Sequence, residues 1–171
     1  MKSVLISIRP QWCEKIASGE KTIEVRKSAP KEVPFKAYIY CSYGDMKTNY
    51  YLNGRGKIIG EFICDSVIEW KYLPDDVFPS WLRMYYISVD DGEKTCLSYR
   101  EIEEYGKGKT LYGWHISDLK IYDKPKELRE FKTGCNGCKE RDTYHCKFHC
   151  YGERPLTRPS QSYMFVEEVE Q

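Results

Sequence analysis

Residues 3–27 read SVLISIRPQWCEKIASGEKTIEVRK and contain three expected secondary-structure elements in direct succession. Residues 3–8 are mostly apolar and β-branched, which is typical of a strand. Pro10 suits the first turn of a helix, where its missing N–H costs nothing, and Gly19 suits the left-handed end of that helix. Alternating side chains in residues 21–27 predict a second strand. The segment therefore predicts a strand, a short helix and a strand, joined by tight connections.

The rest of the chain adds several strands and contains no internal repeat. Four further strands are expected at residues 35–41, 57–68, 109–122 and 161–168. Gly60 marks a bulge or the close approach of another backbone, and Gly113 marks a kink in a long strand. This order of elements predicts an α+β fold, a small mixed β-barrel flanked by helices.

Helical patterns lie mainly in the second half of the sequence. One or two short helices are expected between residues 70 and 86, the second of them around 80–86. A clearer helix covers 99–105, because Ser98 and Glu101 have the spacing of a capping box. Gly106 is expected to end this helix.

Length and composition indicate one soluble, ordered unit. The 171 residues suit a single domain over 1–171, and an aromatic content of 15% argues against disorder. No apolar run approaches the ~20 residues of a membrane span. The apolar stretch at the N-terminus is too short for a signal peptide, so we expect a cytoplasmic protein.

The charges are segregated along the chain although the formal net charge is only +1. Residues 1–36 carry a net charge of +4 and residues 131–159 carry +3, whereas residues 61–104 carry −7. The balance excludes a uniformly basic nucleic-acid binder and predicts local basic patches. We expect the acidic middle segment to form outer helices, away from any polyanion.

A cysteine cluster gives the clearest chemical motif. Residues 135–150 read CNGCKERDTYHCKFHC, with gaps of two, seven and three residues between the cysteines. A C-x-x-C turn presents two thiolates to one ion, and zinc takes four such ligands. We therefore expect a zinc-stabilised lobe at 132–152, before the last strand. Its structural zinc ion would be bound by Cys135, Cys138, Cys146 and Cys150.

Two alternatives to this ligand set remain open. His145 or His149 could replace one of the cysteines in a site of three thiolates and one imidazole. The cysteines could also be free, or Cys135 and Cys138 could form a redox pair.

A group of polar and aromatic residues lies near the N-terminus. Strand alternation places Glu24 and Arg26 on one face and turns Ile23 and Val25 to the other. Spacing alone favours an exposed salt bridge. The alternative is a cleft in which arginine contacts a phosphate or a base edge and glutamate accepts from an exocyclic amine. Trp12 could stack on a base or belong to the core.

Several motifs follow one another in order over nearly the whole chain. They are SIRP at 7–10, GxKTxExRK at 19–27, YIYCS at 38–42, IIGEF at 58–62, WHIS at 114–117 and RPSQSYMFV at 158–166. In these motifs the chain resembles the ASCH domain of the PUA-like superfamily. The cysteine-rich insertion is not part of the minimal domain and resembles an elaboration of some bacterial and phage-type members.

The resemblance implies a small β-barrel flanked by helices, with a cleft that binds RNA or a modified nucleotide. The family's cleft residues correspond here to Ser7, Arg9, Pro10, Lys21, Glu24 and Arg26. Ser42 and Ser162 are expected to face the same cleft, and the polar group described above adds Trp12 and Lys27.

Some ASCH-type proteins resembling this one are amidohydrolases that act on N(4)-acetylcytidine with a lysine, a threonine and a glutamate. Lys21 matches the lysine, but Glu24 occupies the threonine position. A carboxylate is a poor substitute for an activated hydroxyl, so this activity is not carried over. Thr22 shares a face with Glu24 and could be a rearranged nucleophile, and Glu61 could be a partner acid.

Three functions are therefore weighed, and binding of RNA or a modified nucleotide comes first. The second is hydrolysis of a modified nucleoside or of RNA, with Lys21 and Glu24 as the candidate catalytic pair. The third is a protein-interaction adaptor whose zinc lobe docks a partner, since zinc knuckles serve either purpose.

Overall fold

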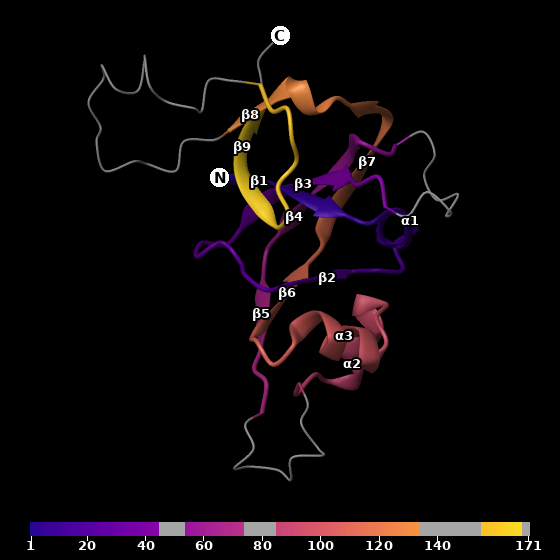
Figure 1. Cartoon of the computed structure of the whole chain (residues 1–171), viewed down its shortest axis with the longest axis vertical. Coiled ribbons are helices and arrows are strands. Elements are labelled where there is room, and N and C mark those ends of the chain that lie inside the picture. The colour runs from indigo at the N-terminus through magenta and orange to yellow at the C-terminus, as the bar shows by residue number, and fades with distance from the viewer. Residues whose placement is uncertain (45–53, 74–84, 134–154, 169–171) are drawn as a thin grey trace, which may run out of the picture.

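The computed structural model describes residues 1–44, 54–73, 85–133 and 155–168 (Figure 1). Nine strands and three α-helices lie in these ranges. The described strands form two sheets. Among the described residues, no helix is long and apolar enough to cross a membrane.

The larger sheet contains six strands and carries most of the core. In spatial order they are β7 (Ser117–Lys126), β4 (Lys57–Cys64), β3 (Phe35–Cys41), β1 (Ser3–Ile8), β9 (Tyr163–Glu168) and β8 (Phe131–Thr133). β1 and β3 run parallel, whereas the other neighbours are antiparallel. The parallel pair needs a crossover connection, and helix α1 (Pro10–Ala17) lies in that connection.

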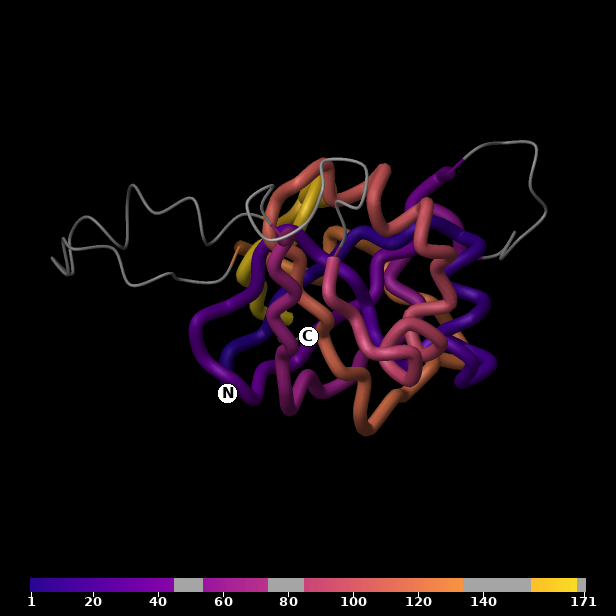
Figure 2. The backbone as a smooth tube through the Cα atoms, turned by 90° about the horizontal axis from the view of Figure 1, so that it is seen from below, coloured from indigo at the N-terminus to yellow at the C-terminus, as the bar shows by residue number. Residues whose placement is uncertain are grey.

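The smaller sheet contains three antiparallel strands. Their order is β2 (Ile23–Arg26), β6 (Leu111–His115) and β5 (Val67–Trp70). In Figure 1 this sheet lies between the larger sheet and two helices, α2 (Val89–Thr95) and α3 (Tyr99–Gly106). Figure 2, which views the molecule from below, shows these two helices in front.

The two long strands expected from the sequence are each divided between the two sheets. The first is interrupted at Asp65 and Ser66, between β4 and β5, and the second at Ile116, between β6 and β7. The interruptions face each other: His115 N–H donates to Ser66 O at 3.1 Å, and His115 Nδ1 lies 2.7 Å from Asp65 Oδ1. The expectation of one small β-barrel is therefore corrected to two sheets without a closed barrel in the described part of the chain. The physical reason is that the two predicted strands are interrupted at neighbouring positions, so that both change from the larger to the smaller sheet at the same place.

The sequence predicted a structural role for two glycines within strands, and the structure confirms the prediction for one of them. At Gly60 a Cβ would lie 2.5 Å from Lys120 O, beside a register shift between β4 and β7, so the expected bulge and close approach are confirmed. Gly113 was expected to kink its strand, but it lies inside β6. A Cβ there would lie 2.6 Å from the ring of Trp70, so the glycine makes room for packing instead.

The structure confirms the predicted helices only where a proline or a capping box indicated the start of the helix. α1 begins at Pro10 as expected, and α3 has the predicted capping box between Ser98 and Glu101, although it includes Gly106. α2 was not predicted, because it buries only Thr95 and has no apolar stripe. Of the helix expected around 80–86, residues 80–84 lie outside the described residues, and Tyr85 forms a strand-like bridge to Tyr72.

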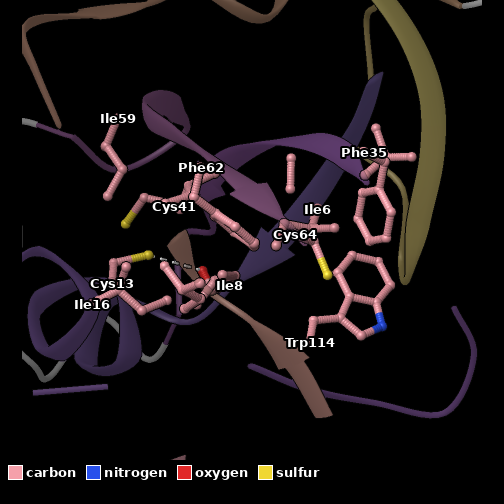
Figure 3. Close-up of a cluster of buried hydrophobic side chains, with 14 residues drawn as sticks. Ile6, Ile8, Cys13, Ile16, Phe35, Cys41, Ile59, Phe62, Cys64 and Trp114 are labelled. Carbon is pink, nitrogen blue, oxygen red and sulfur yellow. Dashed lines mark hydrogen bonds between the residues drawn. The ribbon is translucent and has the colours of Figure 1, made fainter. Parts of the chain in front are cut away.

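The main core lies between α1 and the larger sheet (Figure 3). Trp114 packs edge-on against Phe35, with ring centroids 4.9 Å apart. Cys13, Cys41 and Cys64 are buried among these apolar side chains as free thiols, so they are part of the packing.

A separate apolar cluster attaches α3 to the smaller sheet. Ile102 of α3 packs with Ile23 and Val25 of β2 and with Leu111 of β6. Just before β2, Thr22 N–H donates to Lys94 O of α2 at 3.0 Å. These contacts hold both helices against β2 and define one wall of the site described next.

Candidate functional site

A cavity of about 490 Å³ lies where β1, α1, β2 and α3 meet. Its lining comes from segments far apart in the chain. The lining residues are Ser7, Ile8, Arg9, Gln11, Trp12, Lys21, Glu24, Val25, Arg26, Leu97, Glu101, Glu104, Tyr105 and Gln161. Six of the ten ligand-binding residues expected from the sequence are among them: Ser7, Arg9, Trp12, Lys21, Glu24 and Arg26.

Lys21 lies at the inner end of the cavity, just before β2. Only 2% of its surface is exposed. Its Nζ donates to Thr95 O at 2.6 Å and to Ile23 O at 2.8 Å, and lies 3.4 Å from Glu24 Oε2. Burial lowers the pKa of Lys21, and the neighbouring Glu24 carboxylate opposes that shift. Three acceptors thus match the three protons of the ammonium group.

Glu24 and Arg26 lie on the same side of β2, as strand alternation predicted. They are 7% and 5% exposed, so the interpretation as an exposed salt bridge is wrong. Arg26 Nε lies 3.1 Å from Glu24 Oε1. The Arg26 guanidinium also donates to Ser7 O at 2.7 Å and to Ser162 O at 3.5 Å, which joins β2 to the end of β1 and to the start of β9. We call Lys21, Glu24 and Arg26 the ionic triad.

Two aromatic side chains face the cavity from opposite elements. Trp12 of α1 is half-buried, packs on the main core and also lines the cavity. Lys21 Nζ lies 5.6 Å from the centre of the Trp12 ring. Tyr105 of α3 is 38% exposed, and Lys27 Nζ lies 4.8 Å from its ring centre.

Four of the expected ligand-binding residues lie around the cavity without lining it. Pro10 is buried in the first turn of α1, and Lys27 Nζ lies over the ring of Tyr105. Ser42 N–H donates to Ile8 O at 2.8 Å, and Ser162 contributes its carbonyl oxygen to Arg26. These residues shape the surroundings of the cavity.

Two further residues considered for catalysis are not in the cavity lining. Thr22 lies beside the ionic triad in sequence, but its backbone bonds to Lys94 of α2 and to Ile116, the residue between β6 and β7. Glu61 lies on the larger sheet, where it accepts from Lys36 at 3.1 Å and from Tyr122 at 2.5 Å.

Eight lining residues were not expected from the sequence, and half of them come from α3 and the turn before it. These four are Leu97, Glu101, Glu104 and Tyr105. The capping box located α3 but carried no information on which face of it would meet β2. The other four are Ile8, Gln11, Val25 and Gln161.

The cavity is lined by equal numbers of basic and acidic side chains, whereas a basic cleft was expected. Three basic side chains, Arg9, Lys21 and Arg26, are balanced by Glu24, Glu101 and Glu104. Two of these acids, Glu101 and Glu104, belong to the acidic segment 61–104, which was expected to form outer helices away from any polyanion. They line the cavity because α3 packs against β2.

The expected zinc ligands Cys135, Cys138, Cys146 and Cys150 lie outside the described residues. Within the described ranges no group of three or more histidine, cysteine or acidic side chains could hold a metal ion. The two ends of the cysteine-rich segment lie together, because Lys132 bridges to Pro155 and Leu156 N–H donates to Phe131 O at 2.7 Å. The segment therefore leaves and re-enters the fold at one point, beside β8.

Comparisons with known proteins relate the fold to solved structures. No protein-family model matches the chain, and no curated protein sequence does. The crystal structure of ASCH from Zymomonas mobilis is similar, with a TM-score of 0.52, 19% identity and coverage of 74% of either chain. A tyrosine-to-phenylalanine variant of that protein gives a TM-score of 0.52 and 18% identity, covering 75% of this chain and 77% of the other.

A serine-to-alanine variant of the same protein matches over a longer stretch. Its TM-score is 0.56 at 16% identity, and the match covers 99% of this chain and 89% of the other. Identities this low establish the fold alone. The fold of this chain is thus similar to that of ASCH domain structures, as the sequence motifs had indicated.

Proposed function

We propose that the cavity binds a nucleotide, either free and modified or as an unpaired residue of RNA. The observation that carries this proposal is the combination of a buried ionic triad with two aromatic rings in one cavity. A volume of about 490 Å³ lies within the range of small-molecule sites. The likeness of the fold to ASCH structures supports the same class of ligand.

The aromatic rings suit a planar base. Trp12 and Tyr105 belong to different helices and both line the cavity. Unpaired bases in RNA complexes stack on such side chains, and one stacked base contributes roughly 1–3 kcal/mol. Because double-stranded nucleic acid keeps its bases stacked inside, this arrangement favours a free nucleotide or a single strand.

The phosphate belongs outside the cavity. Lys21 and Arg26 already contact the backbone carbonyl groups and the carboxylate described above, and three acidic side chains line the walls. Arg9, which also lines the cavity, and Lys27, which lies over the Tyr105 ring, are exposed and take part in none of these contacts. The base therefore enters first, and only one or two cations would contact phosphate, which predicts a shallow dependence of affinity on salt.

The geometry of Lys21 favours binding over hydrolysis. A nucleophilic or general-base lysine must present a free amine to its substrate. The three protons of the Lys21 ammonium group instead match three acceptors of the protein. The residue thus fixes the shape of the inner end of the cavity.

Binding is tested by titrating short single-stranded RNAs and nucleotides into the full chain, followed by calorimetry. We expect Trp12→Phe to bind nearly as well as the natural protein and Trp12→Ala to bind about tenfold or more weakly, from the loss of stacking. Tyr86→Ala is the matched control, because Tyr86 is exposed and does not line the cavity. Equal affinity of the Trp12→Ala and Tyr86→Ala variants, with unchanged melting temperatures, would contradict the proposal.

We also propose a structural zinc ion bound by Cys135, Cys138, Cys146 and Cys150. This rests on their spacing and on the joined ends of the segment that contains them. Metal analysis of freshly purified protein is expected to give about one zinc per chain. Cys138→Ser should lose it and Cys96→Ser should keep it. Protein without zinc would show that this assignment is wrong.

A further inference from the structure

Two buried side-chain nitrogens in the described part of the chain have no hydrogen-bond partner: Arg26 Nε and Trp114 Nε1. Trp114 lies in the main core, but Arg26 lines the cavity. Arg26 Nε is 3.1 Å from Glu24 Oε1 without the angle of a hydrogen bond. Leaving a buried donor unpaired is costly, so an acceptor supplied by a ligand would stabilise this N–H group.

Glu24 supplies the complementary group beside that donor. A carboxylate only accepts hydrogen bonds and has about four acceptor positions. One cation lies near each oxygen of Glu24, Arg26 at 3.1 Å and Lys21 at 3.4 Å. Acceptor positions thus remain on a side chain that is only 10% exposed and lines the cavity.

We infer that the cavity selects bases in which an exocyclic amine adjoins a ring nitrogen with a lone pair, as in cytosine and adenine. Glu24 accepts from the amine, and Arg26 Nε donates to the ring nitrogen. This inference rests on the nucleotide binding proposed above and adds the class of base to it. Modified bases belong to the class as long as one amine proton and the ring lone pair remain.

Bases with the opposite edge are rejected by the same two groups. Uracil and hypoxanthine have a carbonyl oxygen and an N–H group at the corresponding positions. The carbonyl oxygen would face the Glu24 carboxylate, and the N–H group would face Arg26 Nε. A site that leaves buried hydrogen-bonding groups unpaired discriminates strongly against the wrong ligand.

The test compares two pairs of nucleotides that differ only in this edge. Cytidine and uridine 5′-monophosphates, and adenosine and inosine 5′-monophosphates, are titrated into the full chain by calorimetry. We expect the amino member of each pair to bind about tenfold or more tightly. Glu24→Gln should reduce each difference to less than about threefold, because a carboxamide can also donate. Glu14→Gln removes an exposed carboxylate of α1 that does not line the cavity, and it should leave both differences intact.

The outcomes separate this inference from the proposed function. Equal binding of both members of each pair to the natural protein overturns the base selection and leaves nucleotide binding in place. Absence of binding by all four nucleotides, and by single-stranded RNA, overturns both. Should Glu24→Gln fail to fold, the two pairs measured on the natural protein still decide.

Discussion

Glu24 and Glu61 are both strand carboxylates that face a lysine, but they lie in different surroundings. Glu61 is on the larger sheet with a side chain 19% exposed, and each of its oxygens accepts one hydrogen bond, from Lys36 or Tyr122. Glu24 is more deeply buried, lies between two cations and lines a cavity in which the neighbouring Arg26 Nε has no partner. A satisfied carboxylate on a sheet surface has a structural role, whereas a buried one with spare acceptor positions suits the ligand binding proposed above.

The largest expected effect is the loss of stability in Glu24→Ala. This variant leaves Lys21 and Arg26 as buried cations without their carboxylate. Breaking such a buried pair costs about 3–5 kcal/mol of unfolding free energy. Urea denaturation measures it, with Glu104→Ala as the control at an exposed carboxylate, where a change within about 0.5 kcal/mol is expected. A similar small loss in both variants would remove the distinction between the ionic triad and surface charges.

The surroundings of Glu61 should make the fold sensitive to alkaline pH. Burial, followed by the charges of Glu168 and Glu61, raises the pKa of Tyr38 to about 12 from 10.0. Because the pKa is higher in the folded protein, the neutral Tyr38 phenol stabilises the fold. This stabilisation is complete below about pH 10 and is lost between about pH 10 and 12. Denaturation midpoints across this range should fall less steeply in Tyr38→Phe. An identical slope in both proteins would rule out this assignment.

The ionic triad should respond to alkaline pH with the opposite sign. Burial lowers the pKa of Lys21, so the unfolded chain holds this proton to higher pH than the folded protein does. The lysine therefore destabilises the fold at neutral pH, and this effect fades as the pH approaches the unfolded value of about 10.4. Comparing Lys21→Met with the natural protein across this range isolates the contribution. A stability difference that does not change with pH would contradict it.

The smallest effect is expected from Glu61→Gln. Burial raises the pKa of Glu61, but hydrogen bonds from Tyr122 and Lys36 outweigh it and lower the net value. A lowered folded pKa stabilises the fold above the unfolded pKa of about 4.3, and this contribution is lost as the pH falls through the folded value. The variant should lose about 1 kcal/mol near pH 7 and less in acid, with nucleotide affinity unchanged. Reduced affinity would show that the two carboxylates are not functionally distinct.

Local sequence signals predicted the elements that short-range chemistry defines. Pro10 began α1, Ser98 and Glu101 capped α3, and alternation placed Glu24 and Arg26 on one side of β2. In each case the residues that carry the signal lie within a few positions of one another. A local preference therefore suffices to specify them.

The sequence did not reveal how the sheets divide or which surfaces enclose the cavity. β4 and β5 read as one strand because Asp65 and Ser66 interrupt the pairing without a proline or glycine. α2 was missed because it has no apolar stripe, and the acids of α3 gave no sign that they would line the cavity.

Residue types and their spacing thus specified the ionic groups, the strand–helix–strand start and the ASCH-like order of motifs. Tertiary packing supplied the burial of Lys21, Glu24 and Arg26, the wall formed by α3 and the unpaired Arg26 Nε. The reason is that a side chain's burial and hydrogen-bond partners depend on segments distant in sequence. The Arg26 guanidinium, for example, meets carbonyl groups 19 and 136 residues away along the chain.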